Sequence, residues 1–236
     1  MLKIQTYLTE KQQIFKQHPF FQKLEKQNSF HDGASFTPRL TFWVMAFQDV
    51  LRLIPPRVQS KELRRIATHH KIEDSGHDKW FLQDMSFLFK DKKYDIAWLF
   101  NKENEHVRDF VYKVISEVLT LSKDHLRIIL ILVLESTGHI FFEKISNFAK
   151  LKGYDEHLKY FSSYHLEVEL NHAVFEDELE KKLFSVELSL PDRSEAIELI
   201  ARVYDGFNAI FDQWQLSFKE EPFEDVNTGA GGSLVA

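Results

Sequence analysis

The stretch that decides the fold is IILILVLESTGHIFF, residues 128–142 of a chain of 236 residues. Its first seven residues are all aliphatic, a run that suits either a buried strand or a helix surrounded by protein on every side. The residues on both sides keep a helical spacing of apolar positions, and no turn signal interrupts them. We therefore expect a central buried helix over about residues 123–152, closed by Gly153 in the position that favours positive φ.

Further helices are expected on both sides of this one, because Gly (8) and Pro (6) are few and lie between long periodic stretches. We expect them over about residues 3–27, 37–54, 60–89, 104–121, 155–184 and 191–219. Residues 220–236 are acidic and then rich in Gly and Ser, so we expect a disordered tail there. The sequence thus predicts an all-α domain of about seven helices over residues 1–219, followed by that tail.

Composition narrows the classes of function. The net charge of −6 comes from mixed signs without a long basic run, which argues against nucleic acid as a partner. The absence of Cys removes disulfides, thiolate metal sites, iron–sulfur clusters and thiol nucleophiles. The first residues lack the apolar core of a signal peptide, and no aliphatic run approaches the roughly 20 residues that span a bilayer. We therefore expect a cytoplasmic protein that does not enter the membrane.

His165, Glu169 and His172 form the clearest candidate site. Separations of four and seven residues rotate side chains by about 40° and 20°, so the three share one stripe of a helix. Phe161 and Phe175 lie on the same stripe, which makes it the core-facing side. Burying the ionisable groups unpaired would cost several kcal/mol, and a metal ion satisfies carboxylate and imidazole together. The alternative is a solvent-facing stripe, or histidines that are bonded to backbone carbonyls.

Two further motifs, EDSGH (residues 73–77) and ESTGH (residues 135–139), share the pattern Glu-x-[Ser/Thr]-Gly-His. In a helix the Glu and His of each motif share a face, and the interior glycine costs about 1 kcal/mol relative to alanine. Such a glycine indicates the close approach of another backbone or of a ligand. His70, seven residues before His77, and His139 are candidate extra ligands. In the alternative, the matches arise by chance and His139 or Asp74 faces water.

Together these motifs predict one site with three carboxylates and three imidazoles from three helices. Its ligands are Glu73, His77, Glu135, His165, Glu169 and His172. Six such ligands suit two divalent ions with three protein ligands each, which leaves positions open for dioxygen or a substrate. Oxygen and imidazole ligands without thiolate favour iron, or manganese, over a structural zinc. We therefore expect two iron ions per chain.

On these residues the chain resembles the haem-oxygenase-like superfamily, which includes haem oxygenase, thiaminase II, pyrroloquinoline quinone synthase and non-haem diiron oxidases. The likeness covers most of residues 3–219, beginning with HPFF (18–21) and the aromatic stretch FWVMAF (42–47). It is most specific in HLEVELNH (165–172), because diiron members carry His-x3-[Asp/Glu]-x2-His on the corresponding late helix. Glu135 resembles their isolated middle glutamate. Diiron members commonly place the first Glu seven residues before its His, a position that His70 holds here.

The resemblance implies a helical bundle and a diiron oxidase or oxygenase that uses dioxygen to oxidise a small organic substrate, with a homodimer as one candidate assembly. The main alternative is a haem-binding or haem-degrading protein on the same fold, with a histidine as axial ligand. A non-catalytic helical binding protein that has lost the metal is a further alternative. A ferritin-like dimetal bundle would show two Glu-x2-His motifs, and only Glu169-x2-His172 fits. Thiaminase II is less similar, because its nucleophile is a cysteine.

Overall fold

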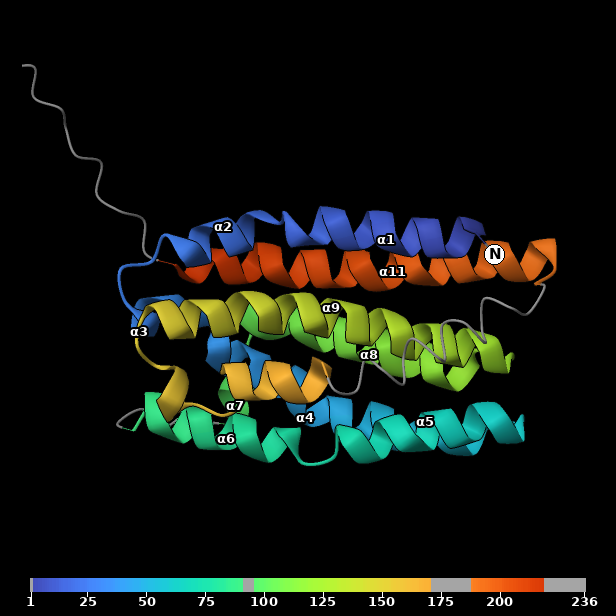
Figure 1. Ribbon diagram of the computed structural model, residues 1–236, viewed down its shortest axis with the longest axis horizontal. Helices are drawn as coiled ribbons and strands as arrows, with labels where there is room; N and C mark the ends of the chain where they lie inside the picture. The colour runs from blue at the N-terminus through green and yellow to red at the C-terminus, as the bar shows by residue number, and fades with distance from the viewer. Residues whose placement is uncertain (1, 91–95, 171–187, 219–236) are drawn as a thin grey trace, which may run out of the picture.

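The computed structural model in Figure 1 describes residues 2–90, 96–170 and 188–218, and these residues form helices and turns without a strand. The all-α prediction is therefore confirmed. The longer helices are α1 (Leu2–Lys16), α2 (Pro19–Glu25), α4 (Thr37–Leu53), α5 (Lys61–Glu73), α6 (His77–Leu88), α8 (Glu105–Thr120), α9 (Asp124–Leu151) and α11 (Leu190–Trp214). The short helices are α3 (Phe30–Gly33) and α7 (Ile96–Leu99), and residues 163–170 are also helical.

Helix α9 lies in the middle of the bundle, with α1 and α11 along one side and α5 and α6 along the other (Figure 1). It packs against α11, α1 and α5, while α4 packs against α8 and α6. Every side chain of the aliphatic run from Ile128 to Leu134 is at most 5% exposed. Burial of each such side chain stabilises the fold by about 2 kcal/mol. The central buried helix is thus confirmed, and Gly153 follows it with a φ of 73°.

The first predicted helix is divided in two, so the prediction of one helix over residues 3–27 is wrong. Pro19 opens α2, where its ring suits the first helical position and its missing N–H costs nothing. His18 caps this helix, because its Nδ1 accepts a hydrogen bond from the N–H of Phe20 at 3.1 Å. The HPFF stretch is therefore a helix start, whose Phe20 and Phe21 are at most 1% exposed in the core.

The third predicted helix, over residues 60–89, is also divided, and this division shapes the site. Helix α5 ends at Glu73, Gly76 adopts a φ of 97°, and α6 begins at His77. A Cβ at Gly76 would meet no described atom within 4 Å, so the glycine serves the left-handed turn and not a close contact. The prediction that Gly76 lies in a helix interior is therefore wrong.

The remaining predicted helices agree in part with the structure. Residues 37–54 correspond to α4, residues 104–121 to α8, and residues 191–219 to α11 followed by a 3-10 turn, η5 (Gln215–Ser217). The helix predicted over residues 155–184 begins later, at residue 163, after the 3-10 turn η4 (Asp155–His157). Its second half and the predicted tail after residue 219 lie outside the described residues. None of the described helices is both long and apolar enough to cross a membrane.

Candidate metal centre

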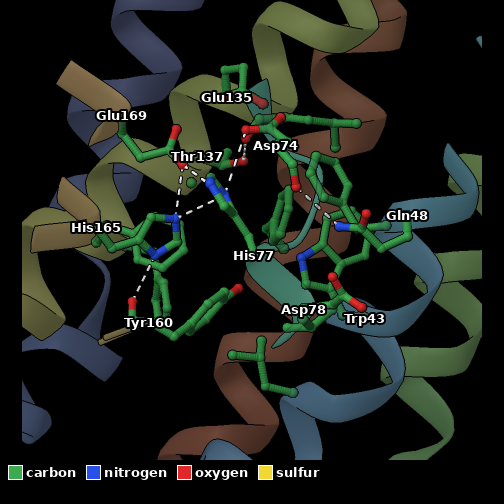
Figure 2. A pocket seen from close by; sticks show the side chains of 18 of the residues that line it. Trp43, Gln48, Asp74, His77, Asp78, Glu135, Thr137, Tyr160, His165 and Glu169 are labelled. Carbon is green, nitrogen blue, oxygen red and sulfur yellow. Dashed lines mark hydrogen bonds and ion pairs between the residues drawn. The ribbon is translucent and has the colours of Figure 1, made fainter. Parts of the chain in front are cut away.

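Two groups of ligand-type side chains lie next to each other inside the bundle (Figure 2). The first group is His77, His165 and Glu169, and the second is His70, Asp74 and Glu135. Within each group the potential ligand atoms lie within 4.8 Å of one another. The residues come from the end of α5, the start of α6, the middle of α9 and the helical segment 163–170. Distant parts of the sequence thus supply both groups.

The first group contains two imidazoles and one carboxylate. His165 Nε2 lies 2.9 Å from Glu169 Oε1 and 3.1 Å from His77 Nδ1. His77 Nδ1 in turn lies 3.3 Å from the same oxygen of Glu169. All three side chains are at most 10% exposed. Two histidines and one carboxylate are the ligand set that non-haem iron(II) oxygenases use.

The ring of His165 is oriented by the turn before it. Its Nδ1 lies 2.8 Å from the carbonyl oxygen of Tyr160, which can only accept, so Nδ1 donates to this oxygen and Nε2 is the ring nitrogen that faces the group. Asp84 holds this turn by accepting hydrogen bonds from the N–H groups of Lys159, Tyr160 and Phe161 at 2.8, 2.8 and 3.0 Å. Burial raises the pKa of Asp84, and the three N–H donors oppose the rise.

The second group contains two carboxylates and one imidazole. His70 Nε2 lies 2.6 Å from Glu135 Oε1 and 3.2 Å from Asp74 Oδ2. Burial, followed by the negative charge of Glu135, raises the pKa of Asp74 well above its ordinary value, while His70 acts in the opposite direction. Two carboxylates this close and this deep therefore require a proton or a cation between them.

Asp74 connects the two groups. Its Oδ2 faces His70 of the second group, while its Oδ1 lies 3.7 Å from His77 Nδ1 of the first. The side chain is only 4% exposed, so solvent does not compete for these oxygens. With one oxygen toward each group, Asp74 would be able to contribute a ligand atom to an ion in either group, and carboxylate ligands of this kind are common in helical bundles. The donor set therefore fits two divalent ions.

The structure brings most of the predicted ligands together. His77, Glu135, His165 and Glu169 belong to the two groups, as does the extra candidate His70. His172 lies outside the described residues. His139 is half-buried on α9, and it belongs to neither group among the residues described. The metal-binding role of each residue stays a prediction.

Glu73 is the predicted ligand that the structure places elsewhere. Its Oε2 lies 2.8 Å from Nδ1 of His69, one turn back along α5 and half exposed. Because α5 ends at Glu73 and the turn at Gly76 follows, Glu73 and His77 do not share a helix face. Asp74, and not Glu73, belongs to the second group of ligand-type side chains. The alternative in which Asp74 faces water is wrong, because the residue is buried. The signal that could have revealed it is its spacing of four residues after His70.

A pocket leads to the two groups, with an empty volume of about 750 Å³ counting its opening to solvent. Its walls are mainly aromatic and aliphatic side chains of α4, α9 and α11, such as Trp43, Phe141 and Phe211. Figure 2 shows His165 and Glu169 on one side of His77, and Trp43, Gln48 and Asp78 on the other. None of the described lining residues is Lys or Arg. The pocket thus suits a largely apolar organic molecule.

Gly138 also lines this pocket. A Cβ there would meet only Phe142, at the ordinary contact distance of 3.9 Å, so no described backbone approaches the glycine. The expectation that another backbone approaches this glycine is therefore wrong. The second expectation, that the glycine leaves room for a ligand, agrees with its position in the pocket wall.

No protein-family model matches the chain, and a comparison with curated proteins finds no match either. The resemblance to the haem-oxygenase-like superfamily thus rests on the residues quoted above and stays a prediction.

Proposed function

We propose that the chain is a metal-dependent oxidoreductase, a non-haem diiron oxidase or oxygenase that uses dioxygen to oxidise a small organic substrate. The observation that carries the proposal is the position of Asp74, whose two oxygens face two adjacent groups of buried ligands. Each group combines carboxylate and imidazole, which favours iron or manganese over a structural zinc. A site for one ion would leave the other group without a metal ion to balance its buried carboxylate charge.

Two ferrous ions, when bound, would supply the electrons that reduce dioxygen. The carboxylate and imidazole side chains of the two groups cannot supply these electrons themselves. Three carboxylates, Asp74, Glu135 and Glu169, would neutralise most of the charge of two divalent ions. The apolar walls of the pocket exclude water and hold the substrate close to the ligands. Burial raises the pKa of Tyr160, which lines the pocket, so its phenol stays protonated and can act as a donor at neutral pH.

The second candidate is a haem protein, which Gly138 favours, because a glycine on a pocket-lining helix leaves room for a flat ligand. A haem has one central iron and needs at most two axial ligands. It would leave the buried carboxylates Asp74, Glu135 and Glu169 without a cation. The dimetal proposal accounts for all three. A binding protein without metal would have to stabilise the same carboxylates by protonation or by ion pairs with the neighbouring histidines.

The proposal is tested by loading the protein with ferrous iron without oxygen, then admitting air while dioxygen consumption and the absorption spectrum are recorded. We expect dioxygen uptake that requires iron, without an intense Soret band. Glu169→Gln should abolish the uptake, while Glu167→Gln, an exposed position on the same helical segment, should retain it. An intrinsic Soret band would favour the haem candidate. Absence of both iron and dioxygen uptake would favour the binding protein.

A further inference from the structure

The indole of Trp80 contacts both imidazoles of the first ligand group. Trp80 lies one turn after His77 on α6, and the two rings stack with centroids 4.4 Å apart at 24°. The same indole meets the ring of His165 edge-on, at 5.4 Å and 87°. Trp80 thus contacts both histidines with one side chain, and its indole is a ring that can be oxidised.

Tyr164 continues this contact to the surface. Its ring lies 5.4 Å from that of Trp80, at 66°, and the residue is 49% exposed. The aromatic contact therefore runs without a break from the buried ligands through Trp80 to solvent. Tyr160 also touches His165, at 4.9 Å, but its ring is buried against Phe142 and leads inward.

We propose that Trp80 and Tyr164 form a path that carries electrons one at a time from an external reductant to the metal centre, an inference that rests on the function proposed above. The side chains of the first ligand group are at most 10% exposed, whereas Tyr164 is 49% exposed, so a reductant in solvent can reach Tyr164 directly. The path would let a reductant return electrons when dioxygen has oxidised the centre and no substrate is present to be oxidised.

The steps balance as follows for one electron. With dioxygen as the terminal oxidant at the loaded centre, Trp80 would give one electron toward the ligand groups and release its Nε1 proton to solvent, which leaves a neutral indolyl radical. Tyr164 then gives an electron and, through solvent, a proton to Trp80 and becomes a neutral phenoxyl radical. An external one-electron reductant, such as ascorbate, returns an electron and a proton to Tyr164. The net change is one electron gained by the centre and one electron lost by the reductant, whose released proton enters solvent.

The position of Lys159 favours the movement of each electron together with a proton. Its Nζ lies 4.7 Å from the ring centre of Trp80 and 5.3 Å from that of Tyr164. A cation over an aromatic face stabilises the neutral ring and disfavours a cation radical. A positive charge on either ring is therefore disfavoured beside Lys159, which favours loss of a proton when the ring is oxidised.

The test follows protein radicals and not product formation. Iron-loaded protein is exposed to dioxygen without substrate or reductant, in the presence of a nitroso spin trap, and the trapped residues are identified by peptide mass spectrometry. We expect the adduct on Tyr164, and its loss in both Trp80→Phe and Tyr164→Phe. Phe keeps an aromatic ring at each position but is not oxidised, and the iron content of both variants is measured so that radical yield is compared per bound iron. Tyr112→Phe is the matched control, because Tyr112 is 53% exposed on α8.

Two results would overturn the proposal. One is an adduct yield on Tyr164 that Trp80→Phe leaves unchanged, and the other is equal labelling of Tyr112 and Tyr164. Both results concern protein that holds iron and consumes dioxygen, so they leave the proposed function standing. A chain that binds no iron overturns both proposals together. Addition of ascorbate should suppress the adduct in the wild type, and failure to do so would exclude Tyr164 as the entry point for electrons.

Discussion

Replacing Asp74 by Asn removes one negative charge from the centre of the site and keeps the shape of the side chain. In the metal-free protein the ligand atoms of Asp74 and Glu135 lie within 4.8 Å of each other. Two full charges at that separation repel by about 3 kcal/mol at an effective dielectric constant near 20. Because Asp74 relieves part of this repulsion by taking up a proton, we expect the free energy of unfolding of metal-free Asp74→Asn to exceed that of wild type by about 1 kcal/mol at neutral pH.

The pH dependence of the metal-free protein gives this prediction its sign. The pKa of Asp74 is raised above its ordinary value of 3.8, so the folded state binds more protons than the unfolded state between the two values. The stabilisation is complete below pH 3.8 and is lost as the pH rises through the raised pKa of the folded state. In Asp74→Asn the free energy of unfolding should no longer fall over this pH range. Denaturant titrations at several pH values would measure it.

The same variant should bind iron poorly. Loss of an outer-shell partner already weakens metal binding by about 10- to 100-fold, so loss of a carboxylate that faces both ligand groups should weaken it by at least about 100-fold. Anaerobic titration with ferrous iron measures the affinity. Glu73→Gln is the matched control, because Glu73 is the preceding residue and contacts His69 instead of the ligand groups. An Asp74→Asn protein that binds iron as tightly as wild type, or that is less stable without metal, would refute the assignment.

Three further changes test other parts of the account. Glu169→Gln should lower iron affinity by at least about 100-fold, with metal-free stability unchanged or slightly higher, measured by titration and denaturation. Asp84→Asn leaves at least one of the three N–H groups without its acceptor, so stability should fall by about 1–3 kcal/mol and iron affinity by about 10-fold or more. Burial lowers the pKa of His18 below 6.5, so its contribution to stability is complete above pH 6.5 and is lost as the pH falls through the lowered pKa. His18→Asn keeps a capping acceptor and should flatten the dependence of thermal unfolding on acid pH.

The sequence predicted the helical class and the central helix because both depend on local periodicity. The run of residues 128–134 is apolar on every side, and only a position in the middle of the bundle can bury it. The breaks at Pro19 and Gly76 were missed for a different reason. A proline or glycine in a periodic stretch either interrupts a helix or is tolerated in it, and tertiary packing decides between the two.

The same ambiguity explains why Glu73 was predicted as a ligand in place of Asp74. A continuous helix through Gly76 would have put Glu73 and His77 on one face, whereas the left-handed turn at Gly76 separates them and leaves Asp74 facing His70. His165, Glu169 and Glu135 were found because buried charges interrupt apolar stripes, a local signal. The contacts of Trp80 with two histidines from different segments have no such signal, since they exist only after the segments pack.

The measurement that tests the central claim most directly is the iron stoichiometry of the chain. Ferrous iron is titrated without oxygen into metal-free protein, and bound metal is determined at saturation together with the absorption spectrum. The account predicts two irons per chain, with both sites lost or weakened in Asp74→Asn because that carboxylate faces both groups. Saturation at zero iron, or one iron in a haem with an intense Soret band, would contradict it.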